Sequence, residues 1–548
     1  MADNGDFFEE EDGVPVQIIS IDEENSKFKL NEEILDEVLS KVPKGMKLSV
    51  VSIVGAFRTG KSFLLDFFLK YLRLPQNKVG REAWSNLFTS KTKLEGNSNK
   101  DATGVNQDSG FSWRSGTERN TMGIWFWSKP FIRKLEGTGE SVAVLLVDTQ
   151  GIFDSRLTQM MAASIFGLST LLSSYQIYNV QNRLQEDHLQ HLALFTEYGR
   201  ATLRMQQEII GGGIAGQEKQ PFQVLQFLVR DFQFETKDFS EENMTKYLDG
   251  FLSIEDRQQK DLKEIREHIQ DSFQQVKIFL LPHPGFDVPE PDFDGDVSKI
   301  RDVFRELLEK YVPLVFNREL APKTISGNYI TSSEFKYFVQ AFVTIFADGD
   351  AFPEPTTLLS ATAEVNNRCA SESAFDSYVS EMDKMCGPGS PFVEAEKLAT
   401  HEKVCFDSAL MKYDSKANLG SASMIKEFRT DLTQKMKKKW EDYSTNNAAK
   451  DPYKNLEFYF FPACICIASY VAHFVASFVC WTPETPEFDF EIADVCQSGK
   501  NMLHFVYGGI FWFFVIMVVV MGKQAWERLQ LIMNPGLAAT TVTASKLD

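Results

Sequence analysis

The sequence predicts an α/β domain with a mostly parallel sheet, followed by an α-helical bundle and two C-terminal transmembrane helices. Three observations support this order. Short apolar runs alternate with helical patterns over residues 14–321, as in sheets whose parallel strands are joined by helices. Helical periodicity without strands continues over residues 333–447. Long apolar runs then follow in residues 456–482 and 502–522, each long enough to cross a bilayer.

Composition limits the classes of function. The chain carries 76 acidic residues against 57 Lys and Arg, a formal net charge of −19, which argues against a nucleic-acid partner because phosphate binding needs clustered cations. The seven cysteines include no C-x-x-C pair, so neither a zinc site nor a disulfide framework is predicted. Residues 1–13 are expected to form a disordered acidic tail. They lack the apolar stretch of a signal peptide, so the N-terminal part is expected in the cytosol.

The central motif of the predicted domain is Gly55-Ala-Phe-Arg-Thr-Gly-Lys-Ser62, which fits the phosphate-binding loop pattern G-x-x-x-x-G-K-[ST]. It lies between a β-rich run and a helical run, the context that this loop needs. Its glycines let backbone N–H groups face a phosphate chain, and the helix that follows directs its positive end at the same phosphates. Lys61 is expected to reach the β- and γ-phosphates and Ser62 to hold Mg²⁺. The alternative is a chance match in an ordinary strand-turn-helix. The loop residues predicted to contact nucleotide are Gly55, Arg58, Thr59, Gly60, Lys61, Ser62 and Phe63.

Two companion motifs follow. Thr121 lies between the polar segment 86–108 and a predicted strand, where it is a candidate switch threonine that completes the Mg²⁺ shell and positions the attacking water. The apolar run 141–147 is typical of a buried strand and ends in Asp148-Thr-Gln-Gly151. This places the Asp148 carboxylate near the metal, acting through water, and the Gly151 N–H near the γ-phosphate. An ordinary turn threonine and a strand-ending acidic turn are the alternatives.

Base recognition is predicted less directly, because the sequence contains no Asn-Lys-x-Asp. Arg230-Asp231 follows the apolar run 222–229. The carboxyl ends of parallel strands meet at one edge of a sheet, so this pair is expected beside Lys61 and Asp148. Asp231 would accept hydrogen bonds from the N1–H and 2-amino groups of guanine, a donor pair that adenine lacks. A structural ion pair between Arg230 and Asp231 would explain the dipeptide equally well.

The remainder of the chain is predicted to connect the catalytic domain to a membrane. Residues 322–332 read as a linker and residues 333–447 as a three-helix bundle. Cations flank the outer ends of the two apolar runs while residues 483–501 between them are acidic, so both termini are expected in the cytosol and residues 483–501 in the lumen. Two buried core helices or a re-entrant hairpin are the alternatives. Residues 523–548 are predicted as a cytosolic tail whose short amphipathic helix lies in the interface or extends the second span.

Together these motifs resemble the atlastins, membrane-anchored GTPases of the dynamin superfamily that fuse endoplasmic reticulum tubules. The resemblance spans most of residues 48–447, and the order of the predicted domains also matches. The segments that carry it are residues 55–62, Gly110-Phe-Ser-Trp-Arg114, Asp148-Thr-Gln-Gly151, Leu184-Gln-Glu-Asp-His-Leu-Gln-His191, Leu194-Phe-Thr-Glu-Tyr-Gly-Arg200, Val229-Arg-Asp231, Leu280-Leu-Pro-His-Pro-Gly285 and Ser360-Ala-Thr-Ala-Glu-Val-Asn-Asn367.

The resemblance implies a P-loop GTPase with GTP as substrate and Mg²⁺ as cofactor. Arg58 would be an arginine finger supplied in cis, which stabilises charge during phosphoryl transfer. Arg230-Asp231 would read guanine, and Arg114 would lie at a nucleotide-dependent dimer contact. The implied catalytic residues are Arg58, Lys61, Ser62 and Thr121. The implied metal ligands are Ser62, Thr121 and, through water, Asp148.

The resemblance also implies a GTP-dependent homodimer that tethers and fuses endoplasmic reticulum membranes, with membrane lipid and other tubule-shaping membrane proteins as partners. Two other functions remain open: a membrane-shaping hairpin protein with a regulatory GTPase domain, and a guanylate-binding-type GTPase without fusion activity. The chain departs from the family pattern in a longer 86–108 loop, in Met122 where a second threonine is usual, in a longer acidic segment between the spans and in a shorter tail.

Overall fold

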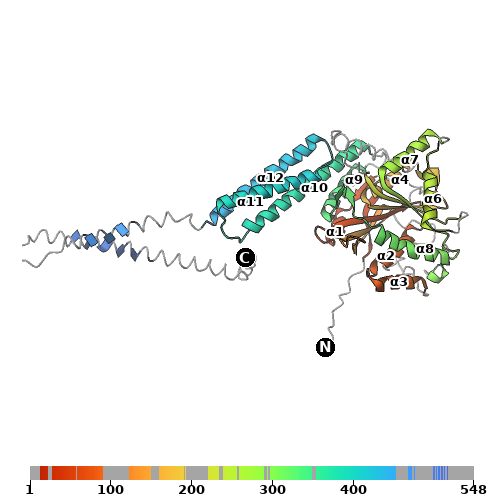
Figure 1. Cartoon of the computed structure of the whole chain (residues 1–548), viewed down its shortest axis with the longest axis horizontal. Coiled ribbons are helices and arrows are strands. Elements are labelled where there is room, and N and C mark those ends of the chain that lie inside the picture. The colour runs from red at the N-terminus through yellow and green to blue at the C-terminus, as the bar shows by residue number, and fades with distance from the viewer. Residues whose placement is uncertain are drawn as a thin grey trace, which may run out of the picture. The chain divides into compact units, whose positions relative to one another are not determined.

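The computed structural model describes residues 13–451 with internal gaps, and only scattered positions between 464 and 515 after them (Figure 1). The gaps are 23–26, 57–58, 90–110, 112–122, 150–158, 190–191, 193–219, 234–237, 256–257, 289–292, 294–295 and 348–352. The predicted acidic tail, membrane segments, luminal loop and C-terminal tail therefore lie almost entirely outside the described residues. Among the residues that are described, no helix is both long and apolar enough to cross a bilayer.

A nine-stranded sheet organises the first of two compact units, which comprises residues 1–379 and 406–436. Its strand order is β2-β1-β4-β6-β3-β7-β8-β9, with β5 paired to β6. Strands β6, β3, β7, β8 and β9 are mutually parallel, and the remaining pairings are antiparallel. The predicted mainly parallel sheet is thus confirmed. The strands are β1 (Pro15–Asp22), β2 (Lys27–Leu30), β3 (Lys47–Gly55), β4 (Ile124–Trp127), β5 (Phe131–Lys134), β6 (Ser141–Thr149), β7 (Tyr175–Gln181), β8 (Phe222–Arg230) and β9 (Phe273–Leu280).

Helices cover both faces of this sheet, with α2, α3 and α8 on one side and α1, α4 and α9 on the other (Figure 1). Strands β3, β6 and β8 are buried along nearly their whole length, which explains why their sequences are continuous apolar runs rather than alternating ones. The helices are α1 (Glu32–Ser40), α2 (Lys61–Arg73), α3 (Lys78–Thr89), α4 (Gln159–Leu172), α6 (Glu241–Leu252), α7 (Lys260–Ser272), α8 (Asp302–Pro313) and α9 (Ser332–Ile345), with single turns at Val297–Lys299 and Leu314–Arg318.

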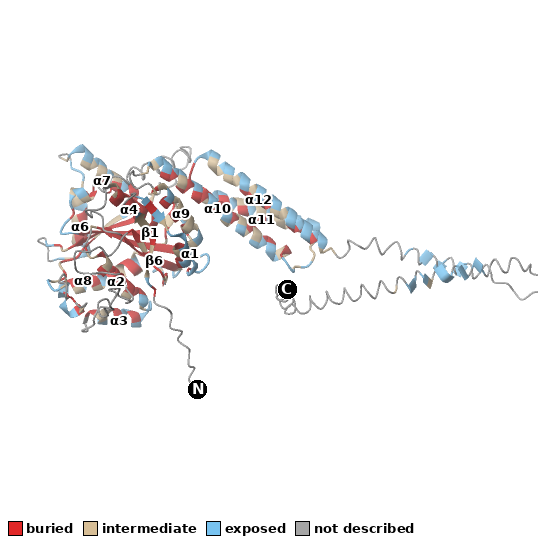
Figure 2. Cartoon of the chain, turned by 180° about the vertical axis from the view of Figure 1, so that it is seen from behind, coloured by how far each residue is buried: buried red, intermediate tan, exposed pale blue. Residues whose placement is uncertain are grey.

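Helical segments follow the sheet, as predicted: α10 (Pro355–Cys386), α11 (Ala395–Lys416) and α12 (Ala422–Ala449). In the first unit, the Asn367 side chain donates a hydrogen bond to the carbonyl of Leu419, 2.9 Å away, and fixes the turn between α11 and α12. In the second unit, comprising residues 380–405 and 437–548, the Tyr443 hydroxyl donates to Asp383 at 2.6 Å. Each helix presents a buried stripe and an exposed face (Figure 2), the pattern of helices packed side by side.

The segment predicted as a linker is an ordered part of the first unit. It forms the hairpin β10 (Thr324–Ile325) and β11 (Asn328–Tyr329). The Lys323 N–H donates to the carbonyl of Leu48 at 2.6 Å, and the Leu48 N–H donates to the carbonyl of Ile330 at 3.0 Å. The Lys323 side chain is buried and its Nζ donates to the carbonyl of Ser173 at 2.7 Å. The hairpin is therefore anchored at the start of β3, the strand that leads into the glycine-rich loop.

The buried Lys323 makes stability depend on pH. Burial lowers the pKa of this amine from 10.5 to about 7, so the unfolded chain binds more protons than the folded one between these values. Stability should then rise with pH in this window, by up to about 1.4 kcal/mol per pH unit for one group.

This contribution is measured from the free energy of unfolding of the parent protein and of a Lys323→Met variant across the same pH range. Methionine cannot titrate, so the variant should gain its largest stability advantage at the lower pH values and lose it as the pH approaches 10.5. Identical pH profiles for the two proteins would contradict the assignment.

Candidate active site

The glycine-rich loop is shaped by its two glycines. β3 ends at Gly55, and a Cβ placed there would lie 2.1 Å from the carbonyl oxygen of Asn179 on β7. Gly60 caps α2 with φ of 73°, in the left-handed region that favours glycine. Gly55 is therefore required by the close approach of the β7 backbone, and Gly60 by the turn that begins α2. Together they place the start of α2 at the carboxyl edge of the sheet.

Lys61 is buried at the first position of α2. Its Nζ donates to the carbonyls of Gly55 at 3.2 Å and Ala56 at 3.0 Å, so the side chain lies over the loop. Burial lowers the pKa of this amine to about 8, and the nearby Asp148 carboxylate partly opposes that shift. A bound triphosphate would replace weak carbonyl partners with a strong anion, because charged acceptors form the stronger hydrogen bonds.

Ser62 and Asp148 meet as predicted. The Ser62 Oγ donates to the Asp148 Oδ2 at 2.8 Å. β6 pairs with β3 so that Asp148 stands opposite Ile53, and the Thr149 hydroxyl donates to the Ile53 carbonyl at 2.8 Å. A hydroxyl and a carboxylate are the hard oxygen donors that Mg²⁺ prefers, and the ion usually takes its other ligands from phosphate and water. The residues present therefore fit a magnesium ion bound together with a nucleotide.

Thr59 is held by side chains from two further strands. Asn179, near the carboxyl end of β7, donates through Nδ2 to the Thr59 carbonyl and to its Oγ1, both at 2.9 Å. Arg230, at the end of β8, donates through Nη1 to the carbonyls of Thr59 at 2.9 Å and Gly60 at 3.2 Å. The sequence did not single out Asn179, because one asparagine at a strand end carries no recognisable signature.

The side chains of Arg230 and Asp231 diverge. Burial lowers the pKa of the Arg230 guanidinium, and Asp231 opposes that shift. Asp231 has a left-handed φ of 57°, and its Oδ2 accepts a hydrogen bond from Gln181 at 3.2 Å. Among the described contacts no salt bridge joins the two side chains, and each has its own hydrogen-bond partners.

The structure thus brings together most of the predicted phosphate-side residues. Arg58, Arg114, Thr121 and Gly151 lie outside the described residues. Phe63 is buried and its ring packs edge-on against Phe67 at 5.3 Å, so only its backbone remains for nucleotide contact. The predicted residues that meet around the start of α2 are Gly55, Thr59, Gly60, Lys61, Ser62, Asp148 and Arg230.

A pocket of about 320 Å³ lies beside the loop. His188 lines it, and its Nδ1 accepts a hydrogen bond from the Gln185 N–H at 3.0 Å. Burial lowers the pKa of this imidazole, against the opposing effect of Asp187, so His188 is neutral at physiological pH. The lining residues are Ala56, Thr59, Tyr178, Asn179, Val180, Gln181, Asn182, Gln185, Asp187 and His188.

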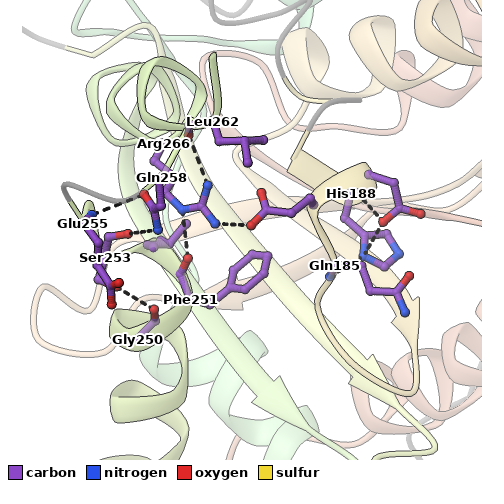
Figure 3. A network of polar contacts seen from close by, with 12 residues as sticks. Gln185, His188, Gly250, Phe251, Ser253, Glu255, Gln258, Leu262 and Arg266 are labelled. Carbon is purple, nitrogen blue, oxygen red and sulfur yellow. Dashed lines mark hydrogen bonds and ion pairs between the residues drawn. The ribbon is translucent and has the colours of Figure 1, made fainter. Parts of the chain in front are cut away.

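A polar network holds the segment that carries Gln185 and His188 (Figure 3). Buried Arg266 of α7 forms an ion pair with Glu186, in the segment that contains Gln185 and His188. The same guanidinium donates to the carbonyls of Phe251 at 3.0 Å and Leu262 at 3.1 Å. The segment after β7 is therefore anchored to α6 and α7 through one arginine.

Residues 25–324 match the family described as Guanylate-binding protein, N-terminal domain. Together with the fold and the phosphate-binding loop, this match defines the protein as a GTPase, a hydrolase of the guanylate-binding class. Among curated proteins, the chain is 38% identical to Atlastin of Drosophila melanogaster over 81% of its own length and 77% of that protein. It is 35% identical to Atlastin-3 of Homo sapiens over 84% of this chain and 80% of that protein. The chain belongs to the atlastin family, which confirms the resemblance inferred from its motifs.

The low pKa of Lys61 predicts that GTP binding weakens as the pH rises through about 8. A bound triphosphate favours the protonated amine, whereas above this pH the nucleotide-free lysine must first take up a proton. The affinity should fall by up to about tenfold per pH unit. Titration with a fluorescent GTP analogue, from below to well above pH 8, measures the effect.

A Lys61→Arg variant is the matched control, because a guanidinium stays charged throughout this range. Its affinity for the analogue should be independent of pH, whatever its absolute value. An equal decline in both proteins would show that another group is responsible.

Proposed function

We propose that the protein is a membrane-anchored GTPase that tethers and fuses endoplasmic reticulum membranes. The observation that carries the proposal is the convergence of Lys61, Ser62 and Asp148 at the carboxyl edge of the sheet in a member of the atlastin family. In this proposal GTP is hydrolysed to GDP and phosphate, and the cycle of binding and hydrolysis drives association of two copies on apposed membranes.

At the phosphate side, Lys61 pairs with the β- and γ-phosphates, and Ser62 and Asp148 are the residues that would hold Mg²⁺. The ion, when bound, neutralises charge on the β- and γ-phosphate oxygens. Arg58 is assigned as the cis arginine finger, and Thr121 positions the attacking water. These roles rest on the family match and on the position of the loop.

At the base side, Asp231 is assigned as the guanine reader. The Gln181 side chain donates a hydrogen bond to the Asp231 Oδ2 at 3.2 Å. This bond fixes the orientation of the other carboxylate oxygen. Guanine presents two adjacent donors, N1–H and the 2-amino group, to a carboxylate acceptor. Asp231 follows β8, and the carboxyl ends of parallel strands are where open α/β sheets bind nucleotides.

The membrane side of the proposal rests on the sequence. Residues 456–482 and 502–522 anchor the protein in the endoplasmic reticulum membrane, with both termini cytosolic. GTP dimerises two catalytic domains through a face that includes Arg114, and the helical bundles then draw the anchors together. Membrane lipid and other tubule-shaping membrane proteins are the expected partners.

An Asp231→Asn substitution should change the base preference from guanine to xanthine. Asparagine offers one acceptor and one donor, which match the N1–H and the 2-carbonyl of xanthine. GTP affinity should fall about tenfold to a hundredfold, the effect of losing a charged hydrogen bond, while XTP becomes a substrate. Competition of both nucleotides against a fluorescent GTP analogue measures this.

Asp187→Asn is the matched control, because Asp187 is a carboxylate of the neighbouring pocket with no assigned role in base reading. That variant should keep the guanine preference. If Asp231→Asn retains full GTP preference, Asp231 is not the reader.

The fusion proposal predicts lipid mixing between vesicles carrying the protein only when GTP can be hydrolysed. Lys61→Ala and Arg58→Ala should both abolish mixing, because each removes a cation from the phosphates. Lys246→Ala, which removes an exposed lysine of α6 paired with Glu242, should mix lipids like the parent. Tubulation without lipid mixing would favour a membrane-shaping role, and full mixing by Lys61→Ala would exclude the mechanism.

A further inference from the structure

We infer that Asn179 and Arg230 are positioning residues that orient the phosphate-binding amides of the loop before nucleotide arrives. This gives Arg230 a role distinct from the base reading expected of the Arg230-Asp231 pair. It also gives a function to Asn179, which no sequence motif singled out.

The two side chains act on the same atom from different strands. Asn179 and Arg230 each donate a hydrogen bond of 2.9 Å to the Thr59 carbonyl oxygen. β7 and β8 are paired, with Gln181 opposite Arg230, so the ends of both strands lie at the loop. A carbonyl oxygen has two lone pairs, and here both are used. The direction of the Thr59 carbonyl is therefore fixed by the protein itself.

The direction of a carbonyl also fixes the next N–H, because a trans peptide is planar and its C=O and N–H point in opposite directions. With the Thr59 carbonyl directed at Asn179 and Arg230, the Gly60 N–H must point away from them. The Gly60 carbonyl accepts from Arg230 and from the Leu64 N–H at 3.1 Å, which directs the Lys61 N–H in the same sense. No described residue accepts a hydrogen bond from either N–H. Successive N–H groups turned to one side form an anion-binding nest.

Both motif glycines are in contact with these two residues. A Cβ at Gly60 would lie 2.4 Å from the Arg230 Nη1, and a Cβ at Gly55 would lie 2.1 Å from the Asn179 carbonyl oxygen. A side chain at Gly60 would displace the Arg230 donor, and a side chain at Gly55 would collide with the backbone of Asn179. The two glycines therefore serve two purposes. They permit the turn of the loop, and their lack of a side chain leaves room for the Arg230 guanidinium beside Gly60 and for the Asn179 backbone beside Gly55.

Burial of Arg230 supports the same role. Arg230 is 7% exposed, its guanidinium lies 5.8 Å from the centroid of the Phe304 ring, and it forms no salt bridge among the described residues. A buried cation is costly unless hydrogen bonds compensate it, and the compensating acceptors here are the carbonyls of Thr59 and Gly60. The charge is thus directed at the backbone of the phosphate loop.

Inorganic triphosphate separates positioning from base reading, because it has no base. The experiment measures competition by triphosphate and by GTP against a fluorescent GTP analogue with Mg²⁺, for the full-length protein and for Arg230→Met. Methionine keeps the apolar stem over Phe304 and removes the donors. If Arg230 positions the loop, both affinities fall by the same factor, about tenfold or more. If Arg230 reads the base, GTP affinity falls and triphosphate affinity is unchanged, which would overturn the inference.

Arg133→Met is the matched control. Arg133 is also a buried arginine, donates to the Tyr71 carbonyl at 2.8 Å and lies 5.5 Å above an aromatic ring, but it contacts the far end of α2. This variant should bind triphosphate like the parent. An equal loss in the control would attribute the effect to general destabilisation and overturn the inference.

Asn179→Ala tests the second donor independently and should weaken triphosphate and GTP binding by a common factor. Should Arg230→Met fail to fold, Arg230→Lys keeps a single donor within reach and should show an intermediate loss for both ligands. Unchanged triphosphate affinity in both Asn179→Ala and Arg230→Lys would refute the positioning role. GTP preference in the parent, which depends on Asp231, is measured in the same titrations, so failure of base recognition is distinguishable.

Discussion

The carbonyl of Thr59 must point into the protein, and the organisation of the site depends on this constraint. Two hydrogen bonds hold it, from Asn179 and Arg230, and these donors lie near the end of β7 and at the end of β8. The sheet order places β7 beside β3 and β8 beside β7, so both donors reach the loop that leaves β3. A fixed backbone needs little reorganisation when an anion binds, which is the basis of electrostatic preorganisation.

The charged groups of the site follow the same arrangement. Asp148 reaches Ser62 because β6 lies on the other side of β3, so Asp148 and the two loop donors approach from opposite flanks. Lys61 is also buried, and burial lowers its pKa although Asp148 opposes the shift. A buried amine with only carbonyl partners has an incomplete shell of acceptors, which a phosphate completes. The arrangement of the site therefore suits an anion.

Much of this arrangement could be predicted from the sequence, for identifiable reasons. Continuous apolar runs mark buried parallel strands, and parallel strands end at one edge, so the meeting of Lys61, Ser62 and Asp148 followed from their positions. The hydrogen bonds of Asn179 could not be predicted, because they depend on the register between β7 and β3. The burial of Lys323 could not be predicted either, because its segment is polar and resembles a linker in sequence. Only its backbone hydrogen bond to Leu48 shows that it is part of the fold.

The most direct test is a pair of crystal structures of the protein, one without nucleotide and one with a non-hydrolysable GTP analogue and Mg²⁺. We expect the Thr59 carbonyl to keep its hydrogen bonds to Asn179 and Arg230 in both, and the amides of Gly60 and Lys61 to face the phosphates when the analogue is bound. A nucleotide-free loop in which that carbonyl points to solvent, and turns inward only on binding, would contradict this expectation.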